Sequence, residues 1–368
     1  MIRVLHVLSE LRSSGAEVAL QAAGGMWEHS GIRCDVLATG HNVGPFAGTL
    51  EAAGYRIHHV PFSGDFHFLR RYASLLRQER YDVVHIHMER ASFYTSLVAI
   101  LAKARCVRTV RSSFFFTGNL RQRRRLQRRI SRALGTRFVA ISPSVAQTEW
   151  EFFRNQTVHI DNWIDVSRFR AASVAERQRA RDNFDVPDDA FVVTTVGNCS
   201  ATKNHAALLE ALARLDCYRW VWIHVGEEDD ASSEQLLARR LGVSSSCRFL
   251  GRSDPLSALH AADLYAMPSL HEGLGMATVE ALSTGLPALL TDVPGNRDLA
   301  DLSSAIVWSA SDVSSLSKGL DGALRVVARA KSSDVSEAQR AAVAARFSPE
   351  RGVCDYAALY RDVLQKGG

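Results

Sequence analysis

The chain has 368 residues, 46% of them hydrophobic and 23% charged, and its formal net charge of +5 is modest. This composition excludes a disordered chain, and the length favours two domains over a single core. No run of about 18 apolar residues is present, which argues against a membrane-spanning segment.

The first half of the chain predicts alternating strands and helices. Short apolar runs rich in branched residues are typical of buried parallel strands. They occur at residues 2–8, 34–40, 56–62, 81–88, 107–113 and 137–143, and a helix is expected over 15–31. The alternation breaks around VHIDNWIDVSRFR, and the charged segment AERQRARDNFDVPDDA follows this break.

The same alternation restarts in the second half. Strands are predicted at residues 191–198, 219–226, 247–251, 263–269 and 286–292, with helices at 204–215, 233–243 and 275–285. Two such series predict an α/β protein with two doubly wound, Rossmann-like domains, 1–165 and 166–345, facing each other across a cleft. A helix is expected in 346–368, with Val353, Tyr356, Tyr360 and Val363 as its apolar stripe.

The stretch PSLHEGLGMATVEALSTGLPALLTD predicts a strand, a glycine-containing loop and a helix. Glu272 falls in the loop and Glu280 inside the helix. The free N–H groups of Gly275, Met276 and Ala277 would face an anion, helped by the helix dipole. A phosphate there would leave one glutamate on each side of a ligand to accept hydrogen bonds from hydroxyl groups. The alternative is an ordinary helix start with two exposed glutamates.

This stretch resembles the Glu-x7-Glu signature of glycosyltransferase family 4, the retaining nucleotide-sugar transferases of GT-B fold. Further segments occur in the family's order: LSELRSSGAE, VVHIHMER, VAISPSV, IDNWID, VGNCSATKNH, HVGEED and CRFLGRSD. The resemblance covers nearly the whole chain. It implies a nucleotide-sugar donor, UDP-linked by preference, and a sugar, glycolipid or small-molecule acceptor in the synthesis of surface polysaccharide, glycolipid or a glycosylated natural product.

The resemblance also implies roles for individual residues on the donor side, which would be the second domain. Glu272 would bind hydroxyls of the transferred sugar, Glu280 the ribose diol, and Lys203 the diphosphate. The diphosphate would also lie on the loop and helix start formed by Gly273, Leu274, Gly275, Met276 and Ala277. The base pocket would be lined by Arg248, Phe249 and Leu250.

The first domain would be the acceptor side. Gly15 would let this domain approach the phosphates, and His87 would lie beside the sugar and the reacting bond. The alternation of strand side chains predicts that His85 points to the other face of the strand, as a packed residue. Family members commonly carry Arg where this chain has Asn198, so either Lys203 acts alone or another cation replaces the missing charge. Arg111 and Arg252 are the candidates for that replacement.

The resemblance implies that the leaving diphosphate helps to take the acceptor's proton, so no carboxylate nucleophile is required. No DxD motif stands at a strand end, and we expect a metal-independent reaction with no cofactor beyond the donor. The six cysteines include no CxxC pair. They predict reduced thiols in a cytoplasmic protein rather than a disulfide framework or a zinc site.

The run RQRRRLQRRISRAL, residues 121–134, places Leu126, Ile130, Ala133 and Leu134 at helical spacing among arginines. One interpretation is a helix resting on the inner face of an anionic membrane near a glycolipid acceptor. The other is a packed helix with a solvated basic face, which would steer anionic substrates. Nucleic-acid binding is disfavoured because no recognisable module accompanies the arginines.

Rival functions remain open at this point. A nucleotide-sugar 2-epimerase of the same architecture would bind the donor without an acceptor. A glycoside hydrolase would use two carboxylates but has no need of Lys203 and a phosphate-binding loop. A non-catalytic binding protein is the third alternative, given Asn198.

Overall fold

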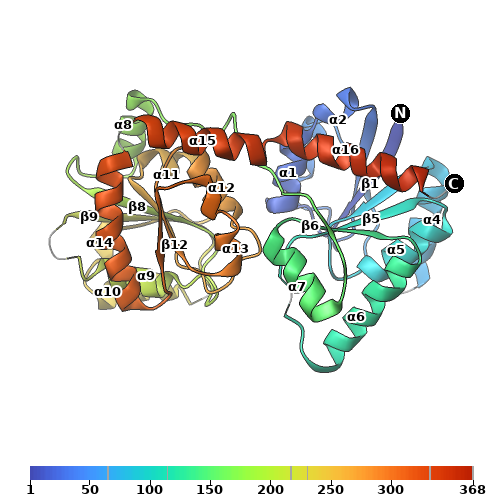
Figure 1. Ribbon diagram of the computed structural model, residues 1–368, viewed down its shortest axis with the longest axis horizontal. Helices are drawn as coiled ribbons and strands as arrows, with labels where there is room; N and C mark the ends of the chain where they lie inside the picture. The colour runs from blue at the N-terminus through green and yellow to red at the C-terminus, as the bar shows by residue number, and fades with distance from the viewer. Residues whose placement is uncertain (64–65, 114, 216–217, 230, 331–332, 367–368) are drawn as a thin grey trace. The chain divides into compact units, whose positions relative to one another are not determined.

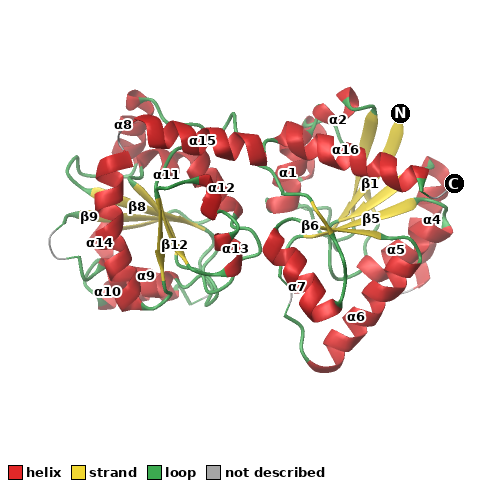
Figure 2. Cartoon of the chain, viewed as in Figure 1, coloured by secondary structure: helices red, strands yellow, loops and turns green. Residues whose placement is uncertain are grey.

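The computed structural model describes residues 1–63, 66–113, 115–215, 218–229, 231–330 and 333–366. The chain forms two compact units, Met1–Asp165 with Phe347–Gly368, and Val166–Arg346 (Figure 1). Each unit is one parallel sheet with helices on both of its faces (Figure 2), which is the predicted doubly wound α/β architecture.

The sheet of the first unit has seven strands in the order β3-β2-β1-β4-β5-β6-β7. Its strands are β1 Ile2–Leu8, β2 Ile32–Ala38, β3 Arg56–His59, β4 Val83–Ile86, β5 Arg105–Val110, β6 Arg137–Ala140 and β7 Val158–His159. Its helices are α1 Gly15–Ala23, α2 Met26–His29, α3 Ala47–Ala52, α4 Phe66–Glu79, α5 Ser92–Leu101, α6 Gly118–Ala133, α7 Pro143–Phe153 and α16 Pro349–Gln365.

The sheet of the second unit has six strands in the order β10-β9-β8-β11-β12-β13. Its strands are β8 Phe191–Val196, β9 Trp220–Val225, β10 Cys247–Phe249, β11 Leu264–Met267, β12 Ala288–Thr291 and β13 Ile306–Ser309. Its helices are α8 Val174–Asn183, α9 His205–Leu212, α10 Ser233–Arg240, α11 Leu256–Ala261, α12 Met276–Ser283, α13 Pro294–Arg297 and α14 Val313–Ala330; α15 Ser333–Phe347 leads back to the first unit.

Two predicted segments differ from the structure. The helix expected over 15–31 is divided into α1 and α2 at Gly24 and Gly25. A Cβ on Gly24 would lie 2.4 Å from the Ala53 carbonyl oxygen, so glycine is required where the chain passes this close to its neighbour. The charged segment after the break forms α8, whose start carries a capping box of Ser173 and Glu176.

The terminal helix α16 belongs to the first unit, where Figure 1 shows it beside α1 and α2. Val353, Tyr356 and Tyr360 are buried in the core on that face of the sheet, and Val363 packs against it. A second cluster around Phe68 and related residues covers the opposite face. The sheet is therefore buried on both faces, as all-parallel sheets require.

Candidate active site

The strand order of the second sheet reverses between β8 and β11, which are neighbours. Ligands of open α/β sheets bind at the carboxyl ends of the strands at such a switch point. The loop after β8 carries Asn198 and Lys203, and the loop after β11 carries Glu272. The fold therefore brings two predicted motifs, 69 residues apart at Lys203 and Glu272, to one edge.

Helix α12 begins at this edge without a side-chain cap. Its N-cap is Gly275, and the first helical backbone bond runs from the Val279 N–H to the Gly275 carbonyl. The N–H groups of Met276 and Ala277 lie in the first turn, where a helix has no carbonyl of its own to offer them. Together with the helix dipole, they make this end suitable for an anion.

The loop before α12 is held close to α13. A Cβ at Gly295 would lie 2.4 Å from the carbonyl oxygen of Glu272, so only glycine fits there. Leu274 is buried and Gly273 is half-buried in the same loop. Gly295 fixes the position of the Glu272 backbone, and the sequence does not show this because the contact joins the loop before α12 to the separate helix α13.

Lys203 and Glu272 form an ion pair. The ammonium Nζ lies 2.7 Å from Oε1 of the carboxylate, and both side chains are largely shielded from solvent. Gly197, at a φ of +149°, makes room for the lysine, since a Cβ there would lie 3.3 Å from the lysine Cε. The sequence analysis gave the two residues separate roles and did not foresee that they neutralise each other in the free protein.

The Glu280 carboxylate lies half-buried on α12 and accepts no hydrogen bond from any residue that the structure describes. Burial raises the pKa of this carboxyl from 4.5 to about 7, although the Arg168 guanidinium acts in the opposite direction. A buried carboxylate without donors is costly, and hydroxyl groups of a ligand would supply them.

Asn198 is exposed, and its Oδ1 accepts a hydrogen bond of 3.0 Å from the Glu227 N–H. Nearby, the Arg252 guanidinium lies 3.7 Å from the Glu227 carboxylate and is half-exposed. Arg252 thus pairs with the residue whose N–H contacts Asn198, the position where the family's arginine is missing.

The predicted base-binding side chains are engaged elsewhere. Arg248 donates from Nε to the Phe184 carbonyl at 2.7 Å. The Phe249 ring packs against Trp222, with ring centroids 5.4 Å apart. A nucleotide base bound at this edge would therefore not contact the Arg248 guanidinium. It would contact the backbone of the strand and of Leu250 instead.

In the first unit, three histidines meet at the end of β1 and β4. They are His6, His85 and His87, and the ring centroids of the last two are 4.0 Å apart. The prediction that His85 faces the other way was wrong, because residues two apart in a strand share a face. His85 is nevertheless a packed residue, as predicted: it is buried, with Nδ1 2.6 Å from the Tyr360 hydroxyl and Nε2 2.7 Å from Oγ1 of Thr109.

His87 is held on both ring nitrogens. Arg111 donates to its Nδ1 at 3.1 Å, so the His87 proton belongs on Nε2, which lies 3.0 Å from Nδ1 of His6. The proton of His6 is then on its Nε2, a buried atom with no partner among the described residues. The order of donation is Arg111 to His87 to His6, and the sequence analysis missed the role of His6.

The three imidazoles are neutral. Burial lowers the pKa of His6 to about 3, and burial together with its neighbours lowers the pKa of His85 and of His87 well below the usual value. Their ring nitrogens lie within 4.8 Å of one another, a spacing that could hold a metal ion. The Arg111 guanidinium donating to His87 disfavours a second cation there.

Gly15 is the first residue of α1. A Cβ at this position would meet nothing within 4 Å in the structure, and its carbonyl accepts from Asn162 Nδ2 and Arg111 Nη1, each at 3.4 Å. Packing within the first unit therefore does not require glycine here, and the predicted approach of a ligand remains a reason for it.

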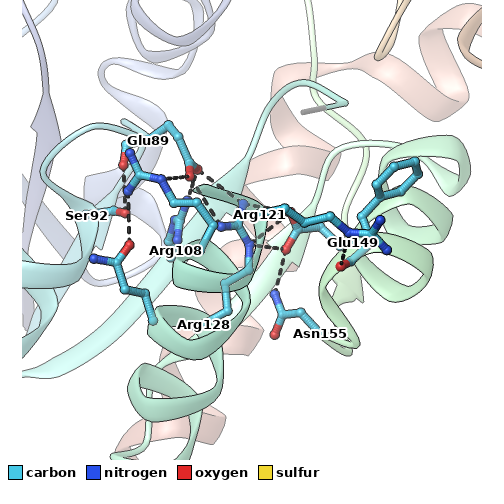
Figure 3. Close-up of polar contacts among 10 residues, drawn as sticks. Glu89, Ser92, Arg108, Arg121, Arg128, Glu149 and Asn155 are labelled. Carbon is cyan, nitrogen blue, oxygen red and sulfur yellow. Dashed lines mark hydrogen bonds and ion pairs between the residues drawn. The ribbon is translucent and has the colours of Figure 1, made fainter. Parts of the chain in front are cut away.

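The basic run forms most of α6, and some of its arginines point toward the rest of the first unit while others are exposed. Figure 3 shows Arg128 between Glu89 and Glu149, and Arg128 is 1% exposed with its Nε 2.8 Å from a Glu149 oxygen. Arg108 pairs with the same Glu89, and Asn155 donates to Glu149 at 2.7 Å. The inward face of α6 is therefore polar.

The predicted apolar stripe of α6 faces outward. Leu126 is 58% exposed, and Ile130 and Leu134 are exposed as well. Exposed arginines lie among them at 123, 125, 129 and 132. Helix α6 packs against α5 and α7 and carries a solvated basic face, as the second interpretation predicts. It packs by the face of Arg128, because Glu89 and Glu149 draw that side chain inward, and the apolar stripe is left exposed.

Comparison with known proteins places this geometry in a family. The family model for group 1 glycosyl transferases matches residues 176–340, and the model for glycosyltransferase family 4 matches residues 13–168. The two matches together take in most of both units.

Two relatives and one solved structure illustrate the similarity. The GDP-mannose:cellobiosyl-diphosphopolyprenol alpha-mannosyltransferase of Komagataeibacter xylinus is 25% identical over 77% of this chain and 72% of its own length. The UDP-Gal:alpha-D-GlcNAc-diphosphoundecaprenol alpha-1,3-galactosyltransferase of Escherichia coli is 26% identical over 61% of each chain. The crystal structure of Anabaena HepE with UDP and glucose superposes with a TM-score of 0.84 at 18% identity, covering 98% of this chain and 100% of that one.

The two sheets match the two-domain GT-B fold of such structures. The chain belongs to glycosyltransferase family 4 and is a glycosyltransferase.

Proposed function

We propose that the protein transfers a sugar from a nucleoside diphosphate sugar, UDP-linked by preference, to a hydroxyl of a lipid-linked or other saccharide acceptor with retention at the anomeric carbon. One observation carries the proposal. At the switch point of the second sheet, an uncapped helix start, an ammonium and two carboxylates are gathered at one edge.

The donor would bind by exchanging partners with the ion pair. Its diphosphate would accept hydrogen bonds from the start of α12 and attract the ammonium of Lys203. The Glu272 carboxylate, now 2.7 Å from that ammonium, would be freed to accept hydrogen bonds from sugar hydroxyls. Glu280 would accept from the ribose diol, which supplies the donors that this buried carboxylate lacks.

Rate acceleration would come from charge placement. As the sugar–phosphate bond breaks, negative charge grows on the diphosphate, and fixed donors stabilise it without reorganisation. The departing phosphate oxygen would help to take the proton of the attacking hydroxyl on the same face, so retention needs no carboxylate nucleophile. Lys203 and the N–H groups of α12 would supply the stabilisation that a metal ion gives in other transferases.

His87 would contribute as a neutral group. With Arg111 on Nδ1 and His6 on Nε2, it can turn to a substrate only by giving up one of these bonds. Its role would therefore be to position a sugar hydroxyl, and a proton-transfer role would require the ring to be released first.

A lipid-linked acceptor is favoured by helix α6. Exposed leucines beside exposed arginines suit the boundary of an anionic bilayer, where apolar side chains enter the acyl region and guanidinium groups meet phosphates. The two named relatives carry polyprenol diphosphates in the names of their acceptors. No helix among the described residues is both long and apolar enough to cross a bilayer.

The test is an incubation with UDP- and GDP-linked sugars, each with and without polyprenol diphosphate saccharides. Nucleoside diphosphate released only with acceptor, and an α-linked product from an α-linked donor, would support the proposal. An altered sugar still attached to the nucleotide would indicate an epimerase. Inversion at the anomeric carbon would contradict retention, and a dependence of transfer on added Mg²⁺ or Mn²⁺ would contradict metal independence.

A further inference from the structure

Behind the loop that carries Lys203, the second unit contains a cluster of buried metal-ligating side chains. Cys199 follows β8, His205 begins α9 and His224 lies near the end of β9. All three are buried, and their ligand atoms lie within 4.8 Å of one another. Glu234, at the start of α10, is also buried and contacts the Cys199 thiol, although its carboxylate lies outside this group of three ligand atoms.

The cluster is poorly satisfied by its own hydrogen bonds. His205 is 1% exposed, yet neither of its ring nitrogens has a partner among the described residues. Oε2 of the buried Glu234 lacks one as well. Leaving such groups unpaired in the interior is costly, and native proteins rarely do so without a reason.

The geometry suits a tetrahedral ion. The Cys199 Sγ and His224 Nε2 atoms are 3.3 Å apart, and the rings of His205 and His224 have centroids 4.6 Å apart. In a tetrahedral zinc site with bonds of about 2.0–2.3 Å, neighbouring sulfur and nitrogen ligands are separated by about 3.3–3.6 Å. Small side-chain rotations would close the remaining gap.

His224 also has the outer partner expected of a metal ligand. Its Nδ1 lies 2.9 Å from Oγ1 of Thr195, whose oxygen also accepts from the Trp222 indole at 3.0 Å. The Thr195 hydroxyl can accept both bonds, and in that arrangement the His224 proton is on Nδ1 and a lone pair is on Nε2, beside the thiol.

We propose that Cys199, His205, His224 and Glu234 form a structural zinc site. A thiolate, a carboxylate and two neutral imidazoles balance the charge of one divalent zinc ion, so the buried site would be neutral. The site lies outside the established glycosyltransferase activity and differs from the expectation that the cysteines bind no metal. Zinc would tie the loop after β8 to α9, β9 and α10, and so would fix the segment that ends in Lys203.

Metal binding would displace one proton. Burial and the neighbouring Glu234 carboxylate raise the pKa of the Cys199 thiol to about 12, so the metal-free thiol is protonated at neutral pH. Binding then releases that proton as the sulfur–metal bond forms. No oxidant or reductant takes part.

The experiment uses the full chain, freed of metal by a chelator and titrated with Co²⁺, then with Zn²⁺ as competitor. We expect one equivalent of Co²⁺ to give thiolate-to-cobalt charge-transfer absorption and the intense visible bands of tetrahedral coordination, both abolished by Zn²⁺. Cys199→Ser should remove the charge-transfer band, and His224→Gln should weaken binding at least tenfold. Cys354→Ser, at an exposed cysteine on α16, should match the wild type.

The band also separates this site from the histidines of the first unit, because coordination by imidazoles alone gives no sulfur absorption. A folded wild type that shows no such band at micromolar Co²⁺ would overturn the proposal. So would a band that persists in Cys199→Ser. Circular dichroism of each metal-free variant checks that the chain is folded. If His224→Gln does not fold, His205→Gln is the second variant, with the same expected loss of metal affinity.

Discussion

At the scale of single residues, Glu280 combines a ligand-binding position with a pKa near neutrality. Below pH 4.5 its carboxyl is protonated in both folded and unfolded chains. Between pH 4.5 and about 7 only the unfolded chain ionises, so folding stability falls as the pH rises, and the cost is complete above the folded pKa. A shift of this size corresponds to about 3 kcal/mol.

Glu280→Gln should therefore raise the free energy of unfolding by about 2 kcal/mol at pH 8 and change it little at pH 4. Urea unfolding at the two pH values measures this. Glu337→Gln, at an exposed glutamate of the same unit, is the control and should show no such pH dependence. An equal effect of Glu280→Gln at both pH values would mean that burial does not control this carboxyl.

The ion pair of Lys203 with Glu272 gives a prediction with an unusual sign. Glu272→Gln removes the carboxylate that competes with phosphate for the ammonium, so UDP alone should bind at least as tightly as to the wild type. Turnover of the intact sugar donor should fall about tenfold to a hundredfold, since the loss of a hydrogen bond to a charged group costs about 1.5–3 kcal/mol. Calorimetry and a transfer assay measure the two effects. Weaker UDP binding with unchanged turnover would contradict the assignment of Glu272 to the transferred sugar.

Sequence reasoning located these residues but not their contacts. Glu272 and Glu280 follow from one motif, whereas the pairing with Lys203 depends on the strand order that makes β8 and β11 neighbours. The role of Gly295 depends likewise on α13 meeting the loop that carries Glu272. The side to which His85 points was predictable from strand geometry, and the period of two was misapplied.

At the scale of elements, most strands were predictable because buried parallel strands are continuous apolar runs. The strand β1 occupies the predicted residues 2–8. The short β7 and β13 were missed, since two to four residues with partly exposed side chains carry little pattern. The apolar stripe of helix α6 was predictable from its helical spacing. The direction in which that stripe points depends on Glu89 and Glu149, which lie outside α6.

The exposed stripe of α6 predicts membrane binding. Leu126→Ser should weaken partitioning to vesicles rich in anionic phosphatidylglycerol by about tenfold, because one leucine side chain leaves the apolar region. Sedimentation with vesicles measures this. Leu236→Ser, at a similarly exposed leucine on α10, should have no effect. Equal losses in both variants, or no binding by the wild type, would contradict the membrane role of α6.

At the scale of the whole molecule, two parallel sheets, each with a switch point, account for how distant motifs act together. In the second unit the edge between β8 and β11 gathers the predicted donor groups, and in the first the edge between β1 and β4 gathers the histidines and Arg111. The order of motifs along the chain predicted this fold class. The choice of sugar and acceptor depends on side chains that contact the ligands and not the rest of the protein. The pattern of strands and helices in the sequence does not determine this choice.

The central claim is that the second unit binds the donor's diphosphate through Lys203 and the start of α12. The most direct measurement is calorimetry of UDP with the wild type, Lys203→Ala and Lys318→Ala, the last being an exposed lysine on α14. We predict one UDP per chain, affinity about tenfold to a hundredfold weaker in Lys203→Ala, and wild-type affinity in Lys318→Ala. Equal affinity in all three proteins would place the phosphates elsewhere and contradict the account.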